Sequence, residues 1–191
     1  MTSEQVLEHF RRTNALLEGH FILSSGLHSP KYLQCALALQ QPLDAGKFGS
    51  AIAEKFADEQ FDSVASPAIG GLIIGFAAAQ ALNIRFIWTE RENGAMTLRR
   101  GFTIEEGEKI LVVEDVITTG GSTRECIAAL QSRGGKVIKA ASIIDRSNGK
   151  ADVGVPRTAL ASLDVPSYKT EDCPMCARGE VAIKPGSRTA K

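Results

Sequence analysis

Short apolar segments of strand type alternate along this chain with segments of helical pattern. Residues 110–113 and 137–144 are mostly apolar without strict alternation, which is typical of strands covered on both faces. Helices interleaved with such strands predict an α/β fold with a mostly parallel central sheet flanked by helices. In such sheets, ligands bind beyond the carboxyl ends of the strands. The predicted strands are 63–66, 85–88, 109–114, 137–144 and 159–165.

Four helices are predicted from local signals. Thr2 and Gln5 have the spacing of a capping box, and the segment after them carries apolar residues on one face. Pro42 and Asp44 mark a second helix start, with apolar side chains at four-residue intervals behind them. A third helix is expected over 71–81 and a fourth from about Ser122 to the glycines at 134 and 135.

The whole chain, 1–191, is expected to form one domain. Its 43% apolar and 23% charged residues are ordinary values for a globular protein. We place the core at about 41–165. Segments 14–40 and 166–191 fit the strand–helix alternation poorly, and we expect them to form a small irregular lobe built from both ends of the chain.

Charge and hydropathy exclude several classes of protein. The 22 basic and 22 acidic side chains cancel, which argues against a nucleic-acid partner bound through a broad basic surface. The longest apolar run, 68–79, is too short to span a bilayer and contains three glycines. The polar N-terminus does not have the pattern of a secretory signal. We therefore expect a cytoplasmic protein with no membrane partner.

Residues 110–124 carry the strongest functional signal. An apolar strand ends in Glu114 and Asp115, and a turn of hydroxyl residues and glycines leads into a helix. Unpaired N–H groups and the positive end of the helix dipole suit a phosphate at such a helix start. The two carboxylates would face ribose hydroxyls or a Mg²⁺ bound with the ligand. The alternative is an ordinary strand–turn–helix junction capped by Ser122 and Thr123.

The segment VVEDVITTGGST resembles the phosphoribosyl-pyrophosphate (PRPP) signature of type I phosphoribosyltransferases. Further segments resemble the orotate-specific family in its short bacterial form: HFILSSGLHSPKYLQC, SPAIGG, TERENGAMTLRRGF and IIDRSNG. The resemblance implies a type I phosphoribosyltransferase fold in which the small lobe is a hood. It also implies transfer of the phosphoribosyl group from PRPP to orotate in pyrimidine biosynthesis, Mg²⁺ as cofactor, and a homodimer.

The resemblance also implies roles for individual residues. Mg²⁺ would be held through PRPP near Glu114 and Asp115, without direct protein ligation. Orotate would contact Thr118, Tyr32 and Arg146, whose planar guanidinium suits a carboxylate. A surface ion pair with Asp145 is the alternative for Arg146. The PRPP-binding residues would be Glu114, Asp115, Val116, Ile117, Thr118, Thr119, Gly120, Gly121 and Ser122.

Residues 89–101 are expected to act as a closing loop over the reacting centre. With Asp115, we assign catalysis to Arg91, Arg99 and Arg100, whose charge would meet the pyrophosphate. A solvated charged hairpin is the alternative. Longer members of the family carry lysines at the positions of Ser24 and Gly70, and this chain has neither lysine.

Two alternative functions remain open. The first is the same fold acting on a purine base, against which Arg146 argues, because a purine has no carboxylate. The second is a PRPP-binding regulator without catalysis, which the missing loop lysines would favour.

The pair Cys173 and Cys176 has CxxC spacing and allows several interpretations. A structural zinc normally needs four ligands, which a second copy of the chain or Cys35 would have to complete. A redox pair is a further option, and a plain tight turn is favoured. The histidines show no metal-binding spacing, and a surface role is favoured for His28.

Overall fold

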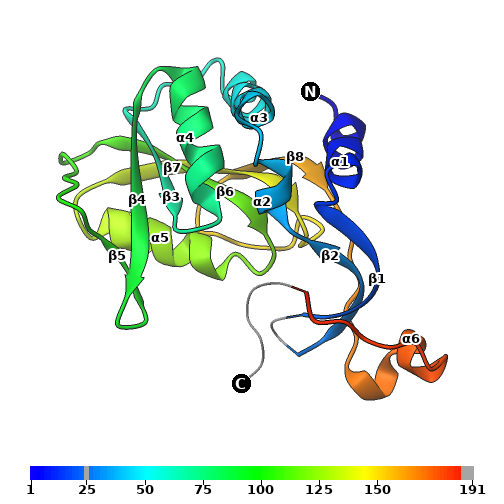
Figure 1. Cartoon of the computed structure of the whole chain (residues 1–191). Coiled ribbons are helices and arrows are strands. Elements are labelled where there is room, and N and C mark those ends of the chain that lie inside the picture. The colour runs from blue at the N-terminus through cyan, green and yellow to red at the C-terminus, as the bar shows by residue number, and fades with distance from the viewer. Residues whose placement is uncertain (24–25, 186–191) are drawn as a thin grey trace.

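A six-stranded sheet forms the centre of the computed structural model, which describes residues 1–23 and 26–185 (Figure 1). The strand order is β5-β4-β3-β6-β7-β8, and every neighbouring pair is parallel except β4 with β5. This confirms the predicted α/β fold. The strands are β3 (Ser63–Pro67), β4 (Arg85–Glu92), β5 (Ala95–Leu98), β6 (Lys109–Ile117), β7 (Lys136–Asp145) and β8 (Arg157–Ser162).

Helices cover both faces of this sheet. On one face, α1 (Ser3–Arg12), α3 (Pro42–Glu54) and α4 (Gly71–Leu82) enclose one apolar cluster, and α5 (Gly121–Gln131) encloses a second on the other face. Neighbouring strand residues divide between the clusters: Leu111 belongs to the first and Val112 to the second. This is why the central strands are almost continuously apolar in sequence. No helix of the described residues is long and apolar enough to cross a membrane.

Local sequence signals place the helix starts correctly. The Thr2 hydroxyl accepts the Gln5 N–H at 3.3 Å, and the Gln5 side chain accepts the Thr2 N–H at 2.8 Å, which completes the capping box. The expected second, third and fourth helices are α3, α4 and α5. Strand β6 continues through the two acids to Ile117, so it is longer than the predicted 109–114.

Residues 89–101 form most of an antiparallel hairpin of β4 and β5. Its turn contains Asn93 (φ 51°) and Gly94 (φ 87°), the residue pair that tight two-residue hairpins favour. Strand β4 is therefore longer than the predicted 85–88.

Both ends of the chain contribute to one small lobe, which we call the hood lobe: residues 14–23, 26–40 and 166–185. It contains the hairpin β1 (Leu16–Ile22) and β2 (His28–Leu33), then α2 (Cys35–Ala38), η1 (Thr170–Asp172) and α6 (Pro174–Ala177). Backbone bonds join the two ends: Ile22 N–H donates to Ile183 at 2.8 Å, and His28 and Tyr168 exchange two bonds of 2.8 Å. Figure 1 shows α6 beside the hairpin. Ser24, Ser25 and the segment 186–191 of the expected lobe lie outside the described residues.

Candidate active site

Of the acidic pair at the end of β6, Glu114 is buried and Asp115 is half-buried. Glu114 is 7% exposed, and the Val116 N–H donates to Asp115 Oδ1 at 2.8 Å. Burial, followed by the nearby Asp115 carboxylate, raises the pKa of Glu114 to about 9. Burial also raises the pKa of Asp115. The pair therefore holds a proton more tightly than free carboxylates do, and a cation or hydroxyl donors facing it would favour its ionised form.

The turn after β6 has the form expected of an anion site. Thr118, Thr119 and Ser122 are exposed at the start of α5, an 11-residue helix whose first N–H groups have no partner within the helix. Gly120 has φ 74°, and a Cβ there would lie 2.8 Å from Val153 Cγ1. Both observations require glycine at this position.

The acids and the turn line one cleft of about 270 Å³. Its walls come from the loop after β3 and from the β6–α5 connection. The lining residues are Pro67, Ala68, Gly70, Glu114, Asp115, Val116, Ile117, Thr118, Thr119, Gly120, Gly121, Ser122 and Thr123. All nine residues predicted to bind PRPP (114–122) thus share one cleft.

The donor set of this cleft fits Mg²⁺ bound together with a sugar phosphate. Carboxylate oxygens are the hard ligands this ion prefers. Neither Glu114 nor Asp115 forms a salt bridge with a lysine or arginine among the described residues. Hydroxyls and N–H groups at the other end of the cleft suit the phosphate.

Arg146 follows the end of β7, the strand beside β6. Its N–H donates to the Ile117 carbonyl at 2.8 Å. Its side-chain Nε is buried with no hydrogen-bond partner among the described residues, and burial lowers the pKa of the guanidinium. Asp145 instead pairs with Arg157 at 3.1 Å, so the alternative of a surface ion pair between Arg146 and Asp145 is wrong. A guanidinium with an unpartnered Nε beside the cleft is suited to a ligand carboxylate.

Cys35 is a residue of this region that the sequence did not reveal. It begins α2 in the hood lobe and is 3% exposed. Burial, and after it the nearby Asp115 carboxylate, raise the pKa of its thiol well above the ordinary value, while the charge of Arg146 acts in the opposite direction. Cys35 therefore lies close to both the acidic pair and the guanidinium. Residues 35 and 115 are far apart in sequence, and no spacing rule links them.

The remaining predicted site residues lie on other elements. The Tyr32 ring, on β2, packs against Phe21 with centroids 5.9 Å apart. The three hairpin arginines form salt bridges with glutamates that do not line the cleft. These contacts are Arg100 to Glu90 at 2.7 Å, Arg99 to Glu92 at 3.2 Å and Arg91 to Glu125 at 2.6 Å. Ser24 lies outside the described residues.

Comparisons with known proteins agree with this geometry. The family described as "Phosphoribosyl transferase domain" matches residues 39–159. A protein of Caldicellulosiruptor bescii named orotate phosphoribosyltransferase is 52% identical over 188 residues, covering 98% of this chain and 99% of that protein. The protein of that name from Thermotoga maritima is 48% identical, covering 97% and 100%.

Solved structures share the fold at lower identity. Orotate phosphoribosyltransferase from Aeropyrum pernix matches with a TM-score of 0.70 at 24% identity, covering 83% of this chain and 93% of the other. The Mycobacterium tuberculosis enzyme in complex with PRPP matches with a TM-score of 0.64, also at 24% identity, covering 83% and 94%. Full-length identity near one half with curated relatives decides the family: the chain belongs to the orotate phosphoribosyltransferases.

Proposed function

We propose that this cleft transfers the 5-phosphoribosyl group from PRPP to orotate, giving orotidine 5′-monophosphate and pyrophosphate in pyrimidine biosynthesis. One observation carries the proposal: an acidic pair, a turn suited to an anion and a guanidinium with an unpartnered Nε occupy adjacent strand ends of one sheet. The acidic pair suits the ribose hydroxyls, the turn suits the 5-phosphate, and the guanidinium suits the orotate carboxylate.

The chain's own residues orient the two reactants. The turn 118–122 holds the 5-phosphate, and Glu114 and Asp115 accept hydrogen bonds from the ribose hydroxyls. Arg146 fixes orotate by its carboxylate, with Thr118 and Tyr32 as further contacts. The ring nitrogen of orotate then bonds to the anomeric carbon as the bond to pyrophosphate breaks, and this nitrogen gives up its proton to solvent. Mg²⁺, when bound with PRPP, supplies positive charge against the leaving group.

Developing positive charge on the ribose lies close to the acidic pair. Ionised Asp115 would stabilise this charge by simple electrostatics. Water would react with a positively charged ribose, so the reaction benefits from a segment that closes over the cleft and excludes water. We assign closure to the β4–β5 hairpin, whose Arg91, Arg99 and Arg100 would exchange their glutamate partners for pyrophosphate oxygens.

A homodimer is also part of the proposal. Large apolar side chains are exposed together on α3, α4 and the loop before α4, where a globular surface is ordinarily polar. Phe76 is 60% exposed and Ile69 83% exposed. A second copy of the chain covering this face would remove them from water. The exposed side chains are Leu43, Ile69, Ile73 and Phe76.

The test is a direct assay. The protein is incubated with PRPP, Mg²⁺ and orotate, and the loss of orotate absorbance is followed, with adenine and hypoxanthine in parallel. We expect turnover with orotate alone. Turnover with a purine but not with orotate would reassign the base, and PRPP binding without any turnover would make the protein a regulator.

A further inference from the structure

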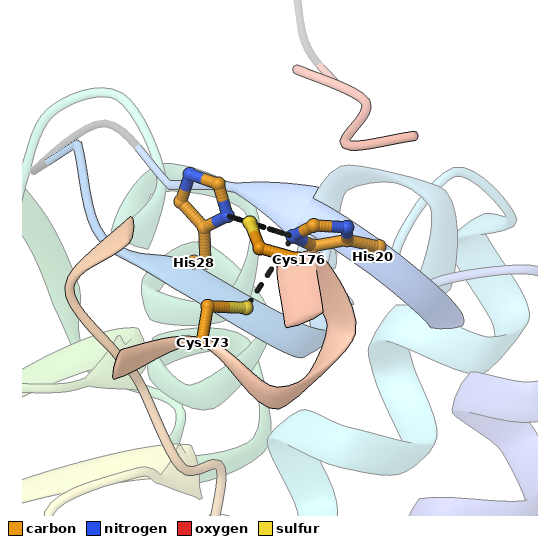
Figure 2. A group of neighbouring side chains, drawn as sticks. All are labelled: His20, His28, Cys173 and Cys176. Carbon is orange, nitrogen blue, oxygen red and sulfur yellow. Dashed lines mark hydrogen bonds between the residues drawn. The ribbon is translucent and has the colours of Figure 1, made fainter. Parts of the chain in front are cut away.

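We propose that His20, His28, Cys173 and Cys176 form a structural zinc site that ties the C-terminal segment to the β1–β2 hairpin. One ligand atom from each residue lies within 4.8 Å of all the others. His20 comes from β1 and His28 from β2 (Figure 2). Cys173 directly precedes α6, and Cys176 lies within it. This site is separate from the proposed active site, and its assignment does not depend on the reaction.

Three of the six distances among these atoms match those of a tetrahedral zinc site, and all six are within 4.8 Å. Zinc–sulfur and zinc–nitrogen bonds of ordinary length hold ligand atoms about 3.3 to 3.8 Å apart. His20 Nε2 lies 3.5 Å from Cys173 Sγ and 3.7 Å from Cys176 Sγ, and His28 Nδ1 lies 3.3 Å from Cys176 Sγ. The two ring nitrogens are 2.7 Å apart, so they need to separate by about 0.6 Å to accommodate the ion.

The outer hydrogen bonds prepare both rings for a metal. His20 Nδ1 lies 2.9 Å from the Glu180 carbonyl. A carbonyl can only accept, so Nδ1 carries the proton and Nε2 presents its lone pair to the cluster. His28 Nε2 lies 3.3 Å from the Thr170 hydroxyl, which leaves Nδ1 facing the cluster. Zinc-binding histidines commonly have such oxygen partners on the other nitrogen.

Burial and charge also suit zinc. Cys173, His20 and His28 are 2%, 5% and 6% exposed. On binding, each thiol gives up its proton to solvent and each neutral imidazole donates a lone pair. Two thiolates then balance the charge of one Zn²⁺, so the buried complex is neutral. Four protein ligands leave no open position, which is the form of a structural rather than a catalytic site.

The position of the cluster gives the ion a mechanical role. The C-terminal segment joins the hairpin through a few backbone bonds, among them Ile183 N–H to His20 at 2.8 Å. Met175, next to the cluster, is 4% exposed, but a lobe this small buries little apolar surface of its own, and such units commonly rely on a metal or disulfides. The surface role expected for His28 is wrong, because His28 is buried. In place of the plain tight turn expected for Cys173 and Cys176, we propose a four-residue cluster of which only Cys176 is half-buried. Neither a second copy nor Cys35 is needed to complete the ligand set.

The first experiment measures metal on the whole protein. The chain is purified under reducing conditions without chelator, exposed to zinc, dialysed, and analysed for metal. We expect one zinc ion per chain, and X-ray absorption at the zinc edge should give two sulfur and two nitrogen ligands. Cobalt substituted for zinc should give the visible absorption of a tetrahedral thiolate site. A zinc-selective chelator should lower the thermal midpoint in the absence of PRPP and Mg²⁺.

Variants locate the site. Cys173→Ser and Cys176→Ser should abolish stoichiometric zinc, whereas the matched controls Cys126→Ala and His9→Gln should retain it. Thr170→Val removes only an outer partner and should weaken zinc affinity by about 10-fold or more while the protein stays folded. This milder variant keeps the test decisive if the cysteine variants do not fold.

Three outcomes would overturn the proposal. They are absence of stoichiometric zinc in the reduced protein after exposure to the ion, equal zinc content in the cysteine variants and the controls, or a Cys173–Cys176 disulfide in freshly purified protein with no metal.

Discussion

The Asp115 carboxylate lies against Gly70: a Cβ built on this glycine would be 2.8 Å from Asp115 Oδ1. Oδ1 also accepts the Val116 N–H at 2.8 Å. A side chain at position 70 would therefore push the carboxylate out of this position.

Gly70→Ala should impair PRPP use without unfolding the protein. The new methyl group displaces the Asp115 carboxylate from the ribose hydroxyls, and misplacement by an ångström costs up to about 100-fold in rate. We expect kcat/KM for PRPP to fall by about 10- to 100-fold. The thermal midpoint without ligand should stay near that of the parent, because Gly70 is exposed and has ordinary helical φ. Unchanged kcat/KM would show that the carboxylate position is not critical.

Glu114→Gln should flatten the pH dependence of stability. Because burial raises the pKa of Glu114 from its ordinary 4.5 to about 9, the folded protein binds this proton more tightly than the unfolded chain does. Ligand-free protein therefore loses stability as pH rises between these values, by at most about 1.4 kcal/mol per pH unit for one linked proton. Glutamine has no proton to lose in this range, so the variant's thermal midpoint should fall less from about pH 6 to about pH 8.5.

The matched control for this measurement is Glu105→Gln, at an exposed position, which should keep the parent's slope. Equal slopes in parent and Glu114→Gln would mean that Glu114 ionises normally in the folded protein.

Arg146→Met should affect orotate far more than PRPP. Loss of two charge-assisted hydrogen bonds to a carboxylate corresponds to about 100-fold or more in kcat/KM for orotate. Arg146→Lys keeps the charge but not the planar pair of donors, and should recover only part of this loss. Without ligand the Met variant should be as stable as the parent, because the Nε it removes has no partner among the described residues. An equal loss for both substrates would argue against a base-recognition role.

Local signals made much of the fold and the phosphate end of the site predictable. The capping box of Thr2 and Gln5, the Pro42 helix start and the apolar strands each act within a few residues. The turn from Glu114 to Ser122 is likewise one contiguous strand–loop–helix unit, so its residues stay together in any correct fold.

Contacts between distant segments could not be predicted in the same way. The contact of His20 with Cys173 spans 153 positions, and it forms only because the C-terminal segment returns to the hairpin. Neither histidine has ligand spacing with the other or with the cysteines. Cys35 lies close to Asp115 for the same reason: the topology of the chain, and no local sequence pattern, brings the two residues together.

Arg91→Ala, Arg99→Ala and Arg100→Ala should separate closure from stability. Their ion pairs with glutamates are partly or largely exposed, and such pairs contribute about 0 to 1 kcal/mol. Thermal midpoints should therefore change little, whereas kcat should fall if the guanidinium groups meet pyrophosphate in the closed state. Arg133→Ala, an exposed arginine after α5, is the matched control. Unchanged turnover in all three hairpin variants would leave the hairpin as a charged surface element.

Phe76→Glu should convert a dimer into monomers. Phe76 is 60% exposed. Its ring packs edge-on against Phe86 with centroids 6.2 Å apart, so the outer part of the ring can contact a second copy of the chain. A carboxylate there would be buried without a partner in the dimer and hydrated in the monomer, which strongly favours dissociation. Val181→Glu is the matched control, because Val181 is 84% exposed but lies in the hood lobe, away from α4. Light scattering after gel filtration should give twice the chain mass for the parent and for Val181→Glu, and the single-chain mass for Phe76→Glu. A dimer that survives Phe76→Glu would place the interface on another face.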